Sequence, residues 1–224
     1  MKDAIKRILK KDIKSLENLK KNNIYVEFDE NNMLNAKALI VGPEDTLYEG
    51  VLLFFDITFP NNYPHIPPVL NYRSNNKIRI HPNIYVSGKV CLSILGTWNG
   101  PSWTSSMDLS CILLSLQSLL NDEPLKNEPG FENYNGPLIE QYNSIMEFNN
   151  IYTLFYKNTK NINPDFLIFQ KYIKENYNKY RDKMISKINT KEIRKNNIKV
   201  PIYRLNVNID YDLLLSKLNK FDIN

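Results

Sequence analysis

Two hydrophobic periods follow one another in the N-terminal third of the chain. Apolar residues at near-helical spacing predict an amphipathic helix over residues 3–20, at Ile5, Ile8, Leu9, Ile13, Leu16 and Leu19. Alternating apolar positions then predict strands at residues 24–28, 33–40, 51–59 and, more briefly, 68–72. Short turns such as DENN separate these segments. The pattern therefore predicts an antiparallel meander preceded by one helix.

The alternation breaks down between the third strand and Trp103. FPNNYPHIPP holds four prolines in ten residues and cannot pair as a central strand. Most of the chain from residue 73 to Trp103 has no regular pattern. A long loop without secondary structure in a compact domain is usually functional. The loop ends at TSSMD, which predicts a helix over residues 107–121 with Ser105 or Ser106 as its N-cap and Asp108 in its first turn.

The helix predicted at residues 107–121 has two different faces. One is a stripe expected to be buried, formed by Leu109, Ile112, Leu113, Leu116 and Leu120. Another carries small polar residues beside larger ones, namely Cys111, Leu114, Ser115, Ser118 and Asp122. Such a low strip is either an ordinary solvated face or a surface on which another protein docks. The residues alone leave both interpretations open.

The C-terminal part is predicted to be mostly helical. The pattern predicts helices over residues 138–157, from Asn163-Pro164 to about residue 188, and from Asp210 through Leu218, with a short extended piece at 201–207. The polar segment NTKNIN at residues 158–163 is the best boundary. We therefore expect two parts, a core at residues 1–158 and a helical extension at 159–224 that is packed on the core or appended to it.

The composition narrows the class of protein. With 42% hydrophobic and 24% charged residues, the chain is typical of soluble globular proteins. Its apolar runs are too short to span a bilayer and its N-terminus lacks a signal-peptide core, so no membrane association is expected. Two cysteines in 224 residues indicate a reducing, intracellular setting. A cytoplasmic location is expected, with the nucleus as an additional one.

The net charge of +5 has two interpretations. Much of the excess lies in Lys- and Asn-rich segments of the C-terminal third, such as KEIRKNNIK. Such segments form either a solvated surface or a contact for an acidic partner or nucleic acid. No motif with interleaved aromatic residues supports nucleic-acid binding. We therefore expect no nucleic-acid partner.

One cysteine stands out, in the stretch HPNIYVSGKVCLSILGTWNGPSW at residues 81–103. Cys91 follows a glycine-containing turn, and the only histidines of the chain are His65 and His81. Neither comes with a cysteine-protease signature, and the few Cys and His residues lack zinc-ligand spacing. No phosphate-binding or dinucleotide motif occurs, so no metal or cofactor is expected. A packed, inert cysteine is the alternative to a reactive one.

A reactive Cys91 without an adjacent base favours acyl transfer over hydrolysis. A carrier of a thioester should lack a strong nearby base, because activated water would hydrolyse the thioester. The side-chain amide of Asn83 could donate a hydrogen bond to a developing oxyanion without removing protons. The residues therefore predict a cysteine that holds an acyl group until an amine arrives.

These motifs resemble the ubiquitin-conjugating enzymes. The resemblance rests on HPN followed after seven residues by Cys-Leu, and on AIKRILKK, GPEDTLYEG and FPNNYPHIPP in the same order. CLSILGTW followed by NEPGFE is similar to the conjugating enzyme Z subgroup. The resemblance implies an α+β fold, with a four-stranded antiparallel meander, an N-terminal helix, a central crossover helix and C-terminal helices.

The resemblance also implies roles for individual residues. Cys91 would accept the C-terminal glycine of ubiquitin from an activating enzyme, and Asn83 would stabilise the oxyanion or hold the loop that shapes the site. Asn127 falls at the position that orients the incoming lysine, with Asp122 and Glu128 as acidic alternatives. The implied supports of the site are His81, Leu92, Asp122 and Trp103.

The implied partners are ubiquitin, an activating enzyme, a ligase and a protein substrate. Donor ubiquitin would dock on Leu114, Ser115 and Ser118. The activating-enzyme and ligase surface would comprise Lys6, Arg7, Lys10, His65 and Ser105. His65 stands where many RING-binding members carry Phe, and Ser105 replaces a proline, so standard RING-ligase binding is in doubt. An insertion containing Trp98 lies beside the predicted site.

Three other functions remain open at this point. The chain could conjugate another ubiquitin-like modifier, or it could be a non-catalytic scaffold of the same fold that binds ubiquitin or a ligase. A basic nucleic-acid-binding module is the third, and it would require the C-terminal extension to bind alone. The presence of Cys91 argues against the scaffold, which predicts a missing cysteine.

Overall fold

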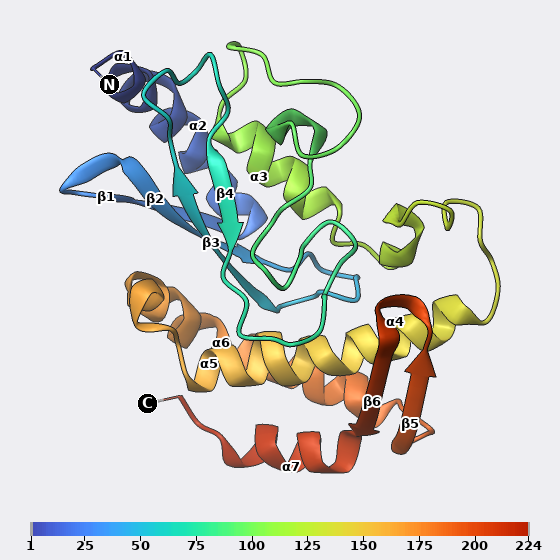
Figure 1. Cartoon of the computed structure of the whole chain (residues 1–224). Coiled ribbons are helices and arrows are strands. Elements are labelled where there is room, and N and C mark those ends of the chain that lie inside the picture. The colour runs from blue at the N-terminus through green and yellow to red at the C-terminus, as the bar shows by residue number, and fades with distance from the viewer. Residues whose placement is uncertain (1, 224) are drawn as a thin grey trace.

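The structure is a computed structural model that describes residues 2–223. Its centre is a four-stranded antiparallel sheet whose strands are neighbours in chain order (Figure 1): β1 (Ile24–Asp29), β2 (Asn32–Val41), β3 (Leu52–Thr58) and β4 (Val69–Tyr72). The predicted meander is confirmed. With helices at its ends and on both sides, the fold is α+β, as the resemblance implied.

One face of the sheet carries the alternating apolar residues that the sequence predicted. Ala38 is paired with Val26 of β1 and with Phe55 of β3, and Phe55 is paired with Tyr72 of β4. Paired residues point to the same face. This row joins the same hydrophobic core as the N-terminal helical segment and the crossover helix.

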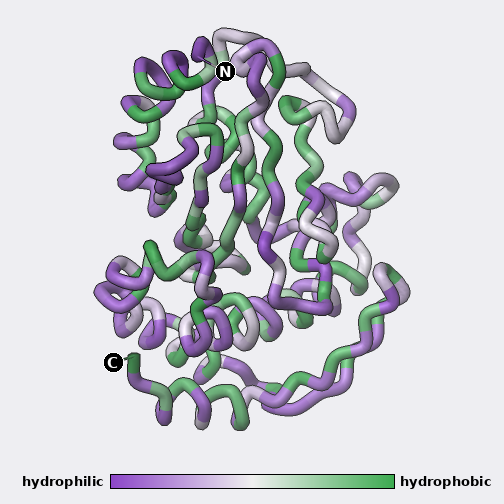
Figure 2. Tube along the Cα trace, turned by 60° about the vertical axis from the view of Figure 1, so that its left-hand side comes forward, coloured by the Kyte–Doolittle hydropathy of each residue, from purple (hydrophilic) through white to green (hydrophobic). Residues whose placement is uncertain are grey.

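The N-terminal helical segment is continuous but not uniform. An α-helical start is followed by a π-helical turn, a second α-helical piece and a 3-10 end: α1 (Lys2–Arg7), η1 (Ile8–Asp12), α2 (Ile13–Glu17) and η2 (Asn18–Asn22). It ends at Asn23, which takes the left-handed conformation with φ 56°. Figure 2 shows mostly hydrophilic positions along its outer side and hydrophobic positions on the side toward the sheet. Leu9, which the spacing placed on the apolar face, is the exception at 55% exposed. The predicted amphipathic helix is confirmed.

The crossover helix α3 (Leu109–Ser118) is shorter than predicted, and its N-cap was predicted wrongly. The carboxylate of Asp108, not Ser105 or Ser106, accepts from the backbone N–H of Ser110 at 3.0 Å. The preceding turn is held to the N-terminal helix instead, because Arg7 donates to the carbonyl of Met107 at 2.6 Å. The predicted stripe is buried, at Leu109, Ile112, Leu113, Leu116 and Leu120.

The C-terminal helices cover one end of the other face of the sheet (Figure 1). The ring of Phe54 lies 4.9 Å from that of Phe166, and the ring of Tyr25 lies 4.0 Å from that of Tyr172. The covering segments are α4 (Leu138–Asn149), η5 (Asn150–Lys157), α5 (Asn158–Lys160), η6 (Pro164–Phe169) and α6 (Gln170–Asn189). Asn163 caps η6 by accepting from the N–H of Asp165, as the sequence predicted.

The chain ends in a two-stranded ribbon and a helix. They are β5 (Lys195–Val200), the 3-10 turn η7 (Ile202–Arg204), β6 (Leu205–Asp210) and α7 (Tyr211–Lys220). The sequence predicted one extended piece at residues 201–207, but its first half is the turn η7 and the strand begins only at Leu205. The sequence missed β5, because this polar strand shows no alternation of apolar residues. The helix was predicted correctly. No helix within residues 2–223 is long and apolar enough to cross a membrane.

The ribbon packs against the loop that follows α3. Leu125, on the 3-10 turn η4 (Pro124–Asn127), shares a small hydrophobic cluster with Tyr142 of α4 and with Val200 and Leu205 of the ribbon. Other residues of the extension join the main core of the sheet. The division of the chain at residue 158 stays a prediction.

Candidate active site

Cys91 lies on irregular chain beside the sheet and is 1% exposed. The turn before it passes close to β4, where the N–H of Tyr72 donates to the carbonyl of Gly88 at 2.8 Å. Gly88 has φ +95°, and a Cβ atom there would lie 2.0 Å from the side-chain oxygen of Asn71. Only glycine fits this turn, which delivers the chain to Cys91.

Asn83 and Cys91 are joined by two hydrogen bonds. The backbone N–H of Cys91 donates to the carbonyl of Asn83 at 2.8 Å. The side-chain amide of Asn83 donates to the carbonyl of Cys91 at 2.9 Å. Both residues are buried. The asparagine of the HPN motif therefore holds the cysteine segment in place, and its second amide hydrogen is available for another acceptor.

His81 is a buried, neutral support. Its Nδ1 accepts from the backbone N–H of Asn83 at 3.0 Å, so the ring proton belongs on Nε2. Burial is the main cause that lowers the pKa of His81 to about 3; a backbone interaction with Leu119 opposes it and the positive charge of Arg79 adds to it. A histidine that is fully buried and already engaged at Nδ1 orients the loop and does not act as a base.

Two residues that the sequence did not single out hold the same loop. The hydroxyl of Tyr48 donates to the carbonyl of Ile80 at 2.6 Å, and Arg79 donates to the carbonyl of Pro82. Together with His81, which binds Asn83, they hold the backbone at Ile80, Pro82 and Asn83. Tyr48 lies in GPEDTLYEG, far from the motif in sequence, so no local spacing could have indicated its contact. Arg79 is only two residues from His81, but nothing in the pattern marked it.

The insertion after Cys91 is anchored to its neighbours by Thr97. Its hydroxyl donates to the carbonyl of Val90 at 2.8 Å and accepts from the N–H of Leu92 at 3.0 Å. Between them lies the 3-10 turn η3 (Ser93–Leu95). Trp98 is 41% exposed at the outer part of the insertion. The insertion is thus tied to both sides of the cysteine, which the sequence did not indicate.

Trp103 supports the proline-rich loop and is not directly bonded to the cysteine segment. Its indole N–H donates to the carbonyl of Pro64 at 2.7 Å, and its ring lies 6.1 Å from that of Tyr63. The exposed residues His65 and Ser105 meet through Nδ1 and Oγ at 3.4 Å. The structure therefore brings together the two loops on which the sequence placed a ligase surface.

The predicted docking residues differ in exposure. On α3, Leu114 is 40% exposed, Ser118 is exposed and Ser115 is half-buried. On the N-terminal helix, Lys6 and Lys10 are exposed, whereas Arg7 is half-buried and bonded to the loop before α3. Arg7 thus has a structural contact in addition to its predicted role.

The residues predicted to orient a lysine gather on the loop after α3. Asp122 and Asn127 line one hollow of about 350 Å³ together with Asn121, Glu123 and Lys126. The side-chain amide of Asn127 donates to the carbonyl of Pro124 at 3.3 Å. Glu128 turns away from this group, because its carboxylate accepts from the hydroxyl of Tyr203.

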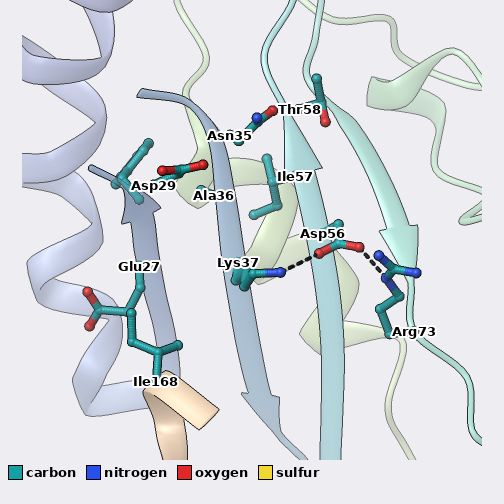
Figure 3. A pocket seen from close by; sticks show the side chains of 11 residues that line it. Glu27, Asp29, Asn35, Ala36, Lys37, Asp56, Ile57, Thr58, Arg73 and Ile168 are labelled. Carbon is teal, nitrogen blue, oxygen red and sulfur yellow. Dashed lines mark hydrogen bonds and ion pairs between the residues drawn. The ribbon is translucent and has the colours of Figure 1, made fainter. Parts of the chain in front are cut away.

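A separate hollow of about 420 Å³ lies on the sheet and contains none of the predicted site residues. Figure 3 shows Lys37 and Arg73 converging on the carboxylate of Asp56, and the Lys37–Asp56 distance is 3.3 Å. Ile168 of the extension reaches its rim. Within residues 2–223 no three Cys, His, Asp or Glu side chains are grouped as a metal site.

Comparison with known proteins gives one consistent result. The family described as "Ubiquitin-conjugating enzyme" matches residues 8–151. Ubiquitin-conjugating enzyme E2 Z of Xenopus tropicalis is 45% identical over 126 residues, which cover 55% of this chain and 40% of that protein. Human ubiquitin-conjugating enzyme E2 Z is 44% identical over 131 residues, covering 58% and 37%. The chain thus spans about two fifths of the length of these relatives.

Among solved structures, the E2 domain of a Toxoplasma gondii ubiquitin conjugating enzyme is 28% identical with a TM-score of 0.46, and the match covers 60% of this chain and 92% of that one.

Proposed function

The chain belongs to the ubiquitin-conjugating enzyme family, and from that premise we propose that Cys91 accepts ubiquitin as a thioester from an activating enzyme and passes it to an amine. The amine is a lysine of a protein substrate. The alternative acceptor is the cysteine of a ligase. The observation that carries the proposal is the doubly hydrogen-bonded pair of Asn83 and Cys91, which places an amide donor on the cysteine segment.

The proposed reaction is two successive acyl transfers. In the first, the thiolate of Cys91 attacks the thioester carbonyl that joins ubiquitin to the activating enzyme, and the activating-enzyme thiolate leaves. In the second, a lysine amine attacks the new thioester carbonyl, the Cys91 thiolate leaves, and the amine gives up a proton as the amide forms. Neither step needs a metal or an organic cofactor in this chain, since ATP is consumed at the activating enzyme.

Asn83 supports this chemistry in two ways. Its amide bond to the Cys91 carbonyl fixes the cysteine segment, and its remaining amide hydrogen could stabilise an oxyanion. His81 contributes by orienting the loop, because its neutral ring is engaged with the Asn83 N–H. With its pKa lowered to about 3 and its Nδ1 engaged, the ring is too weak a base to activate water for thioester hydrolysis. These properties favour holding the acyl group until an amine is positioned.

The surfaces around Cys91 support the proposed partners. Leu114 and Ser118 leave a low exposed strip on α3 for donor ubiquitin, whose docking would restrict the thioester to a reactive geometry. Lys6 and Lys10 offer cations to an activating enzyme, and the loops at His65 and Ser105 offer a ligase surface. We propose a cytoplasmic enzyme, with the nucleus as an additional location and without nucleic-acid or membrane partners.

Asn127 is the proposed residue for the incoming lysine. It shares a hollow with Asp122, whose carboxylate could attract the cationic amine before it loses a proton. Asn127 would then position the neutral amine by hydrogen bonding. Another ubiquitin-like modifier in place of ubiquitin, or binding without catalysis, remains as an outcome of the test.

A charging assay tests the proposal. The chain is incubated with ATP, ubiquitin and an activating enzyme, and the products are separated without reducing agent. A thiol-sensitive adduct is expected, absent in Cys91→Ala and converted to a thiol-resistant ester in Cys91→Ser. Cys111→Ala is the matched control, since Cys111 is the only other thiol, and it should charge normally.

Three outcomes would change the assignment. Charging of Cys91→Ala, or failure of Cys111→Ala alone, would place the acceptor elsewhere. Charging with a different modifier and its activating enzyme, but not with ubiquitin, would change the cargo. Failure with every modifier, together with measurable binding of ubiquitin or a ligase, would indicate a non-catalytic scaffold.

A further inference from the structure

We infer that Tyr203 of the C-terminal extension is a positioning residue for the transfer of the acyl group from Cys91 to an amine. The inference rests on the proposed function and adds a part of the chain beyond the family match, which ends at residue 151. Tyr203 acts through two residues, Arg79 and Glu128, each of which belongs to a loop of the site.

Tyr203 has an unusual backbone conformation at the tip of the β5–β6 ribbon. Its φ is 52° and its ψ is 13°, and the next residue, Arg204, has φ 51°. A bulky residue in the left-handed region is strained and persists only where its surroundings hold it. Here the ring packs 6.4 Å from that of buried Tyr142 and covers Arg79. The strained tip thus delivers an aromatic ring and a hydroxyl to the interior.

Arg79 is held between two aromatic rings. The carbon of its guanidinium lies 4.4 Å from the centre of the Tyr203 ring and 3.6 Å from that of Tyr85. The side chain is 16% exposed, so these contacts are largely desolvated and correspondingly strong. With both faces covered, the guanidinium can use only its edge. That edge donates to the carbonyl of Pro82 and faces Glu128 at 3.9 Å.

The Arg79 contact fixes the peptide group that precedes the Asn83 side chain. Its carbonyl oxygen, from Pro82, accepts from Arg79, and its N–H, from Asn83, donates to Nδ1 of His81. Because a peptide group is planar, holding both polar ends fixes the plane from which the Asn83 backbone continues. The Asn83 side chain donates to the Cys91 carbonyl. The Tyr203 ring therefore influences Asn83 through one intervening arginine.

Glu128 carries the second connection. Its carboxylate accepts from the Tyr203 hydroxyl, and burial raises the pKa of Tyr203, so the hydroxyl keeps the proton that it donates. Glu128 directly follows Asn127, and Leu125 of the same loop is packed against the ribbon. One tyrosine thus holds both the loop of Asn83 and the loop proposed to receive the lysine.

This arrangement predicts a selective defect in Tyr203→Phe. The variant keeps the ring over Arg79 but loses the hydrogen bond to Glu128, so the lysine loop is held to the Asn83 loop only by the 3.9 Å contact between Arg79 and Glu128. Charging of Cys91 from the activating enzyme should proceed at the wild-type rate. Discharge of the purified thioester to free lysine should slow at least about tenfold, because small misplacements of reacting groups have large effects on rate.

Tyr177→Phe is the matched control. Its hydroxyl donates to the carbonyl of Phe221 at 3.1 Å, within the extension, so the same atom is removed at a distance from the site. It should charge and discharge as wild type. Glu128→Gln, which keeps an acceptor for Tyr203, should discharge faster than Glu128→Ala. The double variant of Tyr203→Phe with Glu128→Ala should be no slower than Glu128→Ala, because that substitution already removes the hydrogen bond from Tyr203.

A measurement without activity separates this inference from the proposed function. Hydrogen exchange of the Asn83 side-chain amide, followed by NMR in the full chain, should be faster in Tyr203→Leu, which removes the ring from Arg79, and unchanged in Tyr177→Phe. Wild-type discharge by Tyr203→Phe, or a fall in charging, discharge and thermal stability together, would overturn the positioning role. If the unsubstituted chain does not charge, the proposed function fails, and unchanged Asn83 exchange would then overturn the inference as well.

Discussion

The side-chain amide of Asn83 donates a hydrogen bond to the backbone carbonyl of Cys91 at 2.9 Å. The bond joins two residues eight positions apart. A second hydrogen bond runs in the opposite direction, from the Cys91 N–H to the Asn83 carbonyl. It means that the asparagine of the HPN motif shapes the cysteine segment before any oxyanion forms. Structural and chemical roles of this side chain can therefore be separated by substitution.

Replacing Asn83 should affect transfer more than charging. Asn83→Ala removes the amide and leaves the buried Cys91 carbonyl without that donor, which should lower the free energy of unfolding by about 1–3 kcal/mol. Loss of an oxyanion donor should slow discharge to lysine by about a hundredfold. Charging and single-turnover discharge are measured in parallel, with Asn178→Ala on the exposed side of α6 as the control. Equal slowing of both steps would contradict a donor that acts mainly in transfer.

The Thr97 hydroxyl should be required for a well-formed cysteine segment. Thr97→Val keeps the shape of the side chain but removes its hydrogen bonds to Val90 and Leu92. Charging should therefore slow, and the free energy of unfolding should fall by about 1–3 kcal/mol. Thr97→Ser should restore both. Thr104→Val, at an exposed threonine, tests the substitution itself. A Thr97→Val variant with unaltered charging would show that the insertion anchor is dispensable.

Acid should destabilise the fold through His81. Its pKa is lowered to about 3 in the folded chain against 6.5 as the ordinary value, so the unfolded chain binds a proton that the folded chain does not. The stabilising effect of a neutral His81 is complete above pH 6.5 and is lost as pH falls toward 3, by about 1.4 kcal/mol per pH unit.

Denaturant unfolding at pH 7, 6 and 5 measures this dependence. His81→Asn should flatten the slope relative to wild type, whereas His65→Asn controls for removal of a histidine at an exposed position. The comparison between variants matters, because the raised pKa of buried Asp12 acts in the opposite direction at lower pH. An unchanged slope in His81→Asn would show that the ring is protonated or open to solvent in the folded chain.

The extension should contribute to the stability of the sheet. Phe166 is fully buried against Phe54, so Phe166→Ala should lower the free energy of unfolding by about 3–5 kcal/mol. Ile168→Ala, two residues away on the same 3-10 segment but 59% exposed, is the matched control and should change little. Similar values for the two variants would mean that the extension does not share the core of the sheet.

The active-site loop shows which contacts a local sequence pattern predicts and which it misses. The spacing of HPN and Cys91 was sufficient to single out Asn83 and Cys91, because those residues are close in sequence. Thr97 lies only six residues beyond Cys91, yet nothing in its spacing marked the hydroxyl as an anchor on both sides. The contacts of Tyr48 and Tyr203 come from distant segments and could not be predicted from any one stretch. The roles proposed for Asn127 and the docking surfaces stay predictions.

The sequence by itself determined the order of the strands and one buried face of the sheet, because alternation with period two is a local property of the chain. Only the tertiary structure decided whether the opposite face of the sheet is buried. Leu39 and Phe54 lie on the face opposite that of Ala38 and Phe55, yet they are buried, since Phe166 and Tyr172 of the extension cover that side. Whether this second face is buried depends on which distant segment of the chain packs against it, and the periodicity within a strand does not specify that segment.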